Sequence, residues 1–76
     1  MNYVFITLKC AEQIPLDLKI PNYITGAELL KLLPEITGLE INADIKIQAE
    51  PIGRILDNEQ TLFAEGVGNG ALLTLL

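Results

Sequence analysis

The sequence predicts an α+β fold in which one helix covers one face of a mixed sheet, with the elements in the order β-β-α-β-β-β. Residues 14–20 alternate apolar and polar side chains with the period of two that marks a half-buried strand. Leucines then recur at helical spacing between residues 29 and 36. The other apolar runs are short and bounded by turn residues, which is typical of strands, at 3–9, 45–50, 54–56 and 71–76. With 76 residues, the chain 1–76 is expected to form one domain around one core.

The first two runs are expected to form a hairpin. Residues 3–9 are rich in β-branched and aromatic types, and only a short polar link, residues 10–13, separates them from the next strand. Pro15 has no backbone N–H to donate across a sheet. The strand 14–20 should therefore lie at a sheet edge, or place that position outward.

The helix is predicted to begin just after Thr25. Thr25 and Glu28 have the spacing of a capping box, in which each side chain accepts the other residue's backbone N–H. Pro34 is expected to kink or end the helix near Leu33, and Gly38 to end any remainder. The apolar stripe expected to face the sheet consists of Leu29, Leu30, Leu32, Leu33 and Ile36.

Residues 57–70 are expected to form a long polar connection that Leu62, Phe63 and Val67 pin to the core. The glycine-rich segment 66–70 enters a strand and not a helix, so it lacks the helix N-terminus that a phosphate-binding loop requires. We interpret residues 68–70 as a tight turn with positive φ. The last strand, 71–76, should lie centrally, parallel to the first, where both of its edges are protected.

Charge and cysteine content exclude several classes of partner and compartment. Five basic and ten acidic residues give a net charge of −5, which disfavours nucleic acid and anionic lipid as partners. No apolar run approaches the roughly 18 residues of a membrane span. The single Cys10 cannot form an internal disulfide, and no secretory signal precedes the first strand, so a cytoplasmic location is expected.

Catalysis is not expected. The chain contains no histidine, which excludes Ser-His-Asp and Cys-His arrangements and the common zinc sites. Asp57 and Glu59 lie close in sequence, but we interpret them as a solvated turn. Neither a metal site nor a cofactor-binding motif is predicted.

The candidate site is a protein-binding surface on the sheet face opposite the helix. If Val4, Ile6 and Leu8 point into the core, the residues between them point outward, and the last strand follows the same rule. The outward residues expected to bind a protein partner are Tyr3, Phe5, Leu72, Thr74 and Leu76. All of these except Thr74 are expected to form one apolar patch. The alternative is that Phe5 and Leu72 only pair across strands and stiffen the sheet.

The order of elements resembles the β-grasp fold of ubiquitin. Positions that match ubiquitin's C-terminal half without a gap are Leu56, Thr61, Leu62, Val67, Leu73 and Leu75. Arg54 falls where ubiquitin carries a chain-linking lysine, and Glu50 falls where it carries the central isoleucine of its recognition patch. The Gly-Gly tail of ubiquitin-like modifiers is not present after Leu76, so the resemblance implies binding without conjugation.

The chain also resembles the YukD-like family, small bacterial ubiquitin-like proteins associated with type VII secretion. The resemblance lies in Tyr23, shortly before the helix, and in a terminal Gly-x-x-Leu-x-Leu-Leu pattern over residues 70–76. It implies a non-enzymatic accessory component of the secretion apparatus that acts by protein binding. Two alternatives remain: a small β-grasp subunit of a larger enzyme complex such as a bacterial monooxygenase, and a covalent modifier or sulfur carrier, which would need the Gly-Gly tail.

Overall fold

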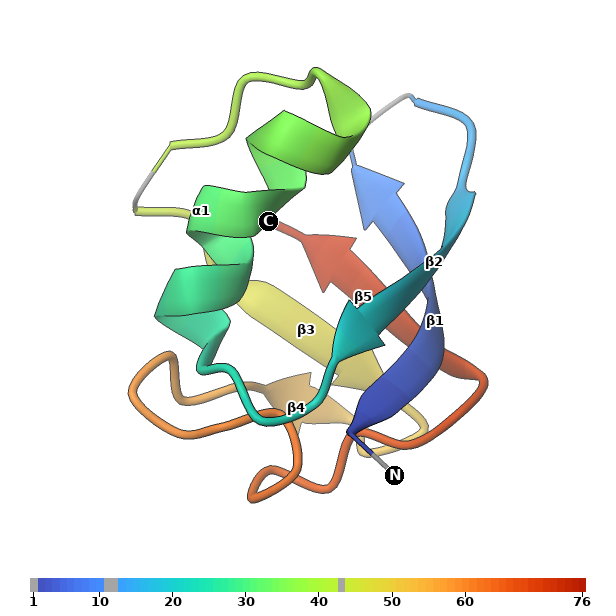
Figure 1. Cartoon of the computed structure of the whole chain (residues 1–76), viewed down its shortest axis with the longest axis vertical. Coiled ribbons are helices and arrows are strands. Elements are labelled where there is room, and N and C mark those ends of the chain that lie inside the picture. Colours follow the sequence, from blue (N-terminus) through green and yellow to red (C-terminus); the bar gives the residue numbers. More distant parts are fainter. Residues whose placement is uncertain (1, 11–12, 43) are drawn as a thin grey trace.

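The computed structural model describes residues 2–10, 13–42 and 44–76. The elements follow the predicted order β-β-α-β-β-β. They are β1 (Tyr3–Cys10), β2 (Leu16–Pro21), α1 (Gly26–Thr37), β3 (Ile47–Glu50), β4 (Arg54–Ile55) and β5 (Ala71–Leu75). The helix lies across one face of the sheet, and the C-terminal strand runs through the middle of it (Figure 1).

The five strands lie side by side in the order β2-β1-β5-β3-β4. β5 pairs with β1 in parallel and with β3 in the antiparallel sense, so the last strand occupies the predicted central position. β2 pairs with β1 only and forms one edge of the sheet, which confirms the interpretation of Pro15.

Two strands, β2 and β3, begin two residues later than the sequence pattern predicted. β2 begins at Leu16, and Ile14, the first apolar residue of the predicted alternation over 14–20, is 82% exposed, so the prediction of a half-buried strand is wrong for this end of the segment. The backbone N–H of Gln13 donates to the carbonyl of Cys10, and the ladder with β1 starts at Leu16, opposite Leu8. β3 likewise begins at Ile47, because Ile45 N–H donates to the carbonyl of Asn42 in a turn.

The helix begins as predicted, and of the two outcomes expected at Pro34 it takes the one in which the helix continues to the predicted end at Gly38. The hydroxyl of Thr25 accepts the N–H of Glu28 at 3.1 Å, and the Glu28 carboxylate accepts the N–H of Thr25 at 2.9 Å. Beyond Pro34 the last turn has its own hydrogen bonds: Thr37 Oγ1 donates to Leu33 O, and Gly38 N–H donates to Pro34 O. These bonds carry the helix to Thr37, and Gly38 ends it with φ +75°.

The core between α1 and the sheet is entirely aliphatic among the described residues. No polar or charged residue of that part of the chain is buried. The buried set is Val4, Ile6, Leu8, Ile20, Leu29, Leu30, Leu33, Ile47, Ala49, Leu56, Leu62, Val67, Ala71, Leu73 and Leu75. Of the predicted helical stripe, Leu32 is half-buried and Ile36 is exposed, so only Leu29, Leu30 and Leu33 belong to the core.

Candidate protein-binding surface

The face of the sheet opposite α1 is the candidate surface, and we call it the outer sheet face. Its residues alternate along each strand with the buried ones, and the strand register aligns Phe5 with Lys19, and Thr7 with both Asp17 and Leu72. The outer sheet face comprises Tyr3, Phe5, Thr7 and Lys9 of β1, Asp17 and Lys19 of β2, Leu72 and Thr74 of β5, Gln48 and Glu50 of β3, Ile55 of β4, and the flanking Lys46 and Leu76.

All five residues predicted for the site lie on this face. Tyr3, Phe5 and Leu76 are exposed, and Leu72 and Thr74 are half-buried between neighbouring strands. Leu76 extends the ladder beyond β5, since its N–H donates to the carbonyl of Lys46 at 2.9 Å. The prediction of which residues of β1 and β5 face the core and which face outward is therefore confirmed. Whether these residues bind a partner stays a prediction.

They do not, however, form one continuous apolar patch. In the parallel ladder Leu72 lies opposite Thr7 and Thr74 opposite Lys9, while β5 starts at Ala71 opposite Ile6. Tyr3 and Leu76 consequently lie toward opposite ends of the sheet. Phe5 and Leu72 are also not directly opposite each other, because Leu72 is paired with Thr7. The alternative, that Phe5 and Leu72 pair across strands and stiffen the sheet, is therefore limited to a diagonal contact.

The turn before β5 shapes the surface beside Phe5. Phe5 N–H donates to Asn69 Oδ1 at 2.9 Å, and Gly70 N–H donates to the Phe5 carbonyl at 2.8 Å. Gly70 has φ +86°, as predicted for this turn, and a side chain built there would meet nothing within 4 Å. An open depression remains above the sheet, lined by Phe5, Thr7, Asp17, Lys19 and Gly70 among others.

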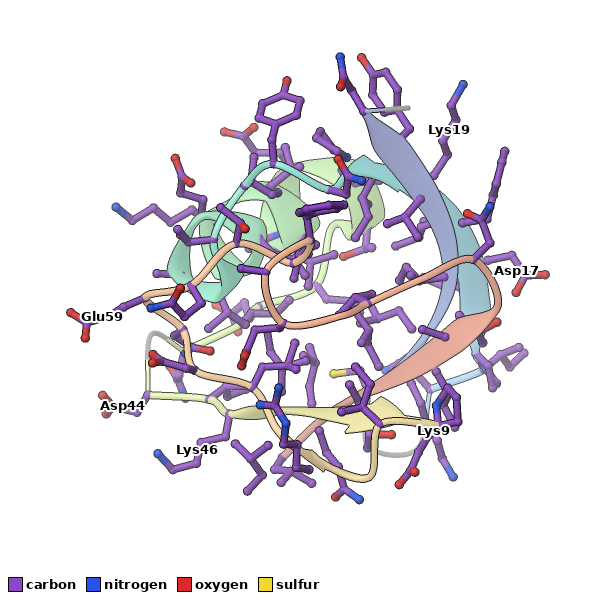
Figure 2. All side chains as sticks on the ribbon, turned by 90° about the horizontal axis from the view of Figure 1, so that it is seen from below. Lys9, Asp17, Lys19, Asp44, Lys46 and Glu59 are labelled. Atoms are coloured by element: carbon purple, nitrogen blue, oxygen red, sulfur yellow. The ribbon has the colours of Figure 1, made fainter. Side chains whose placement is uncertain are left out.

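A lysine lies against the two aromatic rings of this face. Lys19 Nζ is 5.0 Å from the centroid of the Tyr3 ring and 5.9 Å from that of Phe5, within the range of cation–π attraction. The neighbouring Asp17 carboxylate accepts a hydrogen bond from the Thr7 hydroxyl at 2.8 Å. Lys19, Asp17 and Lys9 project outward from the β1–β2 side, away from Glu59 (Figure 2).

Every aromatic residue of the chain is exposed. The two tyrosines and two phenylalanines are 48% (Tyr3), 56% (Phe5), 60% (Tyr23) and 73% (Phe63) accessible. Phe63 was predicted to pin the 57–70 connection to the core, and that prediction is wrong. Leu62 and Val67, the other two residues predicted to do so, are buried. The aliphatic residues already fill the core, which leaves the rings outside.

The four rings gather toward one end of the molecule. Phe63 N–H donates to the carbonyl of Asn22, and Asn22 N–H donates to that of Asn2, which places Tyr23 and Phe63 near the start of β1. Figure 1 shows the start of β1 and the 57–70 connection at this same end. The sequence interpretation missed Tyr23 and Phe63 as surface residues. The sequence does contain a signal for their exposure: leucine and isoleucine are abundant enough to fill a core of this size without aromatic residues.

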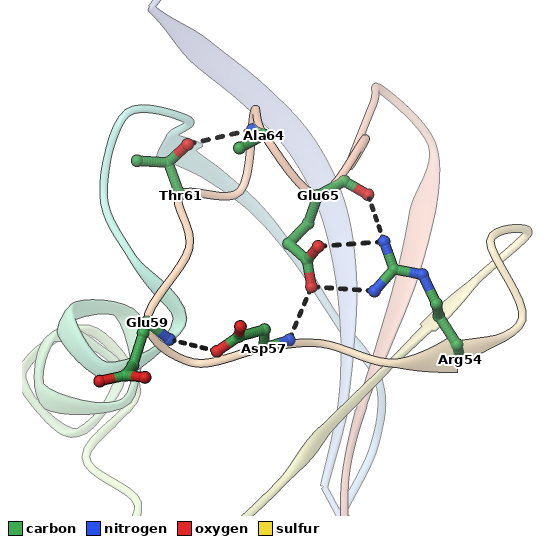
Figure 3. A network of polar contacts seen from close by, with 6 residues as sticks. All are labelled: Arg54, Asp57, Glu59, Thr61, Ala64 and Glu65. Carbon is green, nitrogen blue, oxygen red and sulfur yellow. Dashed lines mark hydrogen bonds and ion pairs between the residues drawn. The ribbon is translucent and has the colours of Figure 1, made fainter.

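A polar network holds the 57–66 connection in place (Figure 3). The Arg54 guanidinium forms a two-point ion pair with the Glu65 carboxylate at 2.9 and 3.0 Å, and Asp57 N–H donates to the same carboxylate at 2.6 Å. These donors, Arg54 first, lower the pKa of Glu65, and the carboxylate raises the pKa of Arg54. Glu59 N–H donates to Asp57 Oδ1, so this acidic pair lies in a turn, as predicted.

Within residues 2–10, 13–42 and 44–76, no three potential ligand side chains gather in a way that could hold a metal ion. Nor does the same part of the chain contain a helix of the length and apolarity needed to cross a bilayer. Cys10 is a free thiol, half-buried at the end of β1.

Comparison with solved structures identifies the fold. A solved structure reported as "Molecular Mimicry of SUMO promotes DNA repair" superposes with a TM-score of 0.82 at 17% sequence identity, over 100% of this chain and 92% of that chain. The ubiquitin of Caldiarchaeum subterraneum matches with a TM-score of 0.74 at 22% identity, over 96% and 90%. The ubiquitin-like domain of tubulin-binding cofactor B gives 0.74 at 19%, over 97% and 88%.

The chain thus has the ubiquitin-like β-grasp fold, an α+β architecture, as predicted. No protein-family model matches its sequence, and neither does any curated protein. The likeness therefore defines the class of fold.

Proposed function

We propose that the chain is a protein-interaction domain without catalytic activity, and that it binds its partner non-covalently through the outer sheet face. One observation carries the proposal: Tyr3 and Phe5 are exposed beside the Lys19 ammonium, on a face that α1 does not cover. Aromatic residues are enriched in the energetically important centres of protein interfaces, where they bury a large area with little loss of side-chain entropy.

We propose further that the partner is a cytoplasmic component of a type VII secretion apparatus in a bacterial cell. The support is the resemblance to YukD-like proteins in Tyr23 and in the pattern over residues 70–76. The free thiol of Cys10 agrees with a reducing compartment.

The test is capture of partners by the tagged chain from the cells that encode it, compared with two variants. Phe5→Asp places a negative charge beside Tyr3 on the outer sheet face and is expected to abolish capture while the fold stays cooperative. Ile14→Asp is the matched control, since Ile14 is an exposed apolar residue outside the outer sheet face. It should capture the partner as the unaltered chain does.

The results separate the possibilities. Partners that include secretion components and leave the beads under denaturing washes support the proposal. Equal capture by Phe5→Asp, with intact folding, would overturn the assignment of the surface. Partners that survive denaturation as adducts of higher mass would show conjugation, and co-purification with a metal-containing hydroxylase would favour the enzyme-subunit alternative.

A further inference from the structure

We infer that the outer sheet face receives an extended acidic segment of a partner protein, with acidic residues at positions i and i+4 and an apolar residue at i+2. The inference rests on the proposed function and names the chemistry of the segment that the surface fits. Three features carry it: the distribution of charge over the two layers, the state of the charged groups on the outer sheet face, and the spacing of its lysines.

The outer sheet face is the basic side of an acidic protein. It carries Lys9, Lys19 and Lys46 against Asp17 and Glu50. The rest of the described chain carries two basic residues against seven acidic ones, which are Glu28, Glu35, Glu40, Asp44, Asp57, Glu59 and Glu65. An acidic segment is thus repelled by the helix layer and the 57–66 connection, and approaches most favourably over the sheet.

The charged groups of the face favour an anion further. Both carboxylates already accept a neighbour's hydrogen bond, Asp17 from the Thr7 hydroxyl and Glu50 from the Gln48 amide. No carboxylate of the described residues lies within ion-pair distance of Lys9 or Lys19. Among the described residues, the Lys19 ammonium lies over the two rings and forms no ion pair, so its N–H groups can donate to a carboxylate of the partner.

The spacing matches an extended chain. Lys19 is aligned with Phe5, and Lys9 lies four residues further along β1, so their backbone positions are roughly 14 Å apart along and across the strands. Residues i and i+4 of an extended segment are about 13 Å apart and point to the same side, as does i+2. A segment lying along β1 with its acidic residues at the two lysines would place its i+2 side chain near Thr7, at the depression beside Gly70.

The test uses three acetylated heptapeptides and backbone amide NMR of the isotope-labelled chain. The first has glutamate at its second and sixth positions, leucine at the fourth and serine elsewhere. The second replaces the glutamates by lysines, and the third moves them to the third and fifth positions, on the opposite side of an extended strand. We expect only the first to shift the β1 and β2 amides with a dissociation constant of about 1 mM or tighter.

The combined variant Lys9→Glu, Lys19→Glu should weaken this binding about tenfold, since each reversed surface charge contributes a few-fold. The affinity of the variant Lys9→Gln, Lys19→Gln for the first peptide should lie between that of the unaltered chain and that of the charge-reversed variant. This neutral variant guards against a folding defect in the charge-reversed one. Comparable binding of the lysine peptide, shifts confined to α1, or no shifts at all would overturn the inference. Shifts that appear on concentrating the chain alone would assign the face to a second copy instead, which also overturns it.

Failure of this inference is distinguishable from failure of the proposed function. If Phe5→Asp loses the cellular partner while Lys9→Glu, Lys19→Glu retains it, the surface binds a protein but not through acidic residues. If both variants retain the partner, the outer sheet face is not the binding surface.

Discussion

Two neighbouring leucines of β5 test the placement of the candidate surface. Leu73 is fully buried under α1, whereas Leu72, the preceding residue, is half-buried on the outer sheet face. Shortening each to alanine removes the same atoms from the same strand. Only the side of the sheet differs, so the pair of variants isolates the effect of the face.

The expected magnitudes follow from burial. Leu73→Ala removes about three methylene equivalents from the core, worth about 2.4 kcal/mol of transfer free energy, and leaves a cavity that raises the loss to roughly 3–4 kcal/mol. Leu72→Ala leaves no enclosed cavity and should lower the free energy of unfolding by about 1 kcal/mol. Domains of this kind have only about 5–15 kcal/mol of stability, so the first variant should be close to marginal.

Urea unfolding followed by far-UV circular dichroism measures both variants. For a slope near 1 kcal/mol per molar urea, the midpoint should fall by about 3 M for Leu73→Ala and about 1 M for Leu72→Ala. If Leu72→Ala destabilises the chain more than Leu73→Ala, the faces are exchanged by a one-residue slip in register. Phe5 would then belong to the core, and the proposed binding surface would be wrong.

Two further predictions concern the helix start and the polar network. Thr25→Ala removes the acceptor for the Glu28 N–H and should lower the free energy of unfolding by about 1 kcal/mol, measurable by urea unfolding; an unchanged midpoint would mean that water replaces the cap. The folded-state pKa of Glu65 lies below its unfolded value, so its stabilising effect is complete at neutral pH and is lost as pH falls through that lowered pKa. Glu65→Gln should therefore lose less thermal stability than the unaltered chain between neutral and acidic pH, and equal losses would contradict a role for the Arg54 ion pair.

Much of the local structure was predictable because it depends on neighbours in sequence. The alternation along β1 assigns Val4 and Ile6 to the core regardless of which strand lies beside them. The capping box needs only Thr25 and Glu28, three residues apart. Gly38 was also predicted to end any helix beyond Pro34, and it does so. Whether the helix passes Pro34 at all was left open by the sequence, because the hydrogen bond from the Thr37 hydroxyl to Leu33 O that supports the last turn has no strong sequence signal.

The arrangement of the candidate surface could not be predicted in the same way. Phe5 N–H meets Asn69 Oδ1 across 64 residues of sequence, and this turn sets where β5 begins against β1. A shift of that ladder along β1 would move Leu72 away from Thr7 without changing any local pattern. The exposure of Phe63 also depends on which other residues, distant in sequence, occupy the core.

The amino-acid sequence alone determines the order of the elements, the residues that face inward on each strand, and the start of the helix, because these follow from backbone periodicity and short-range hydrogen bonds. Only the tertiary structure decides that the aromatic residues gather toward one end, that Lys19 lies over Tyr3 and Phe5, and that Leu76 lies far from them. These relations depend on strand register and on competition for space in the core, and both are settled by contacts between residues distant in sequence.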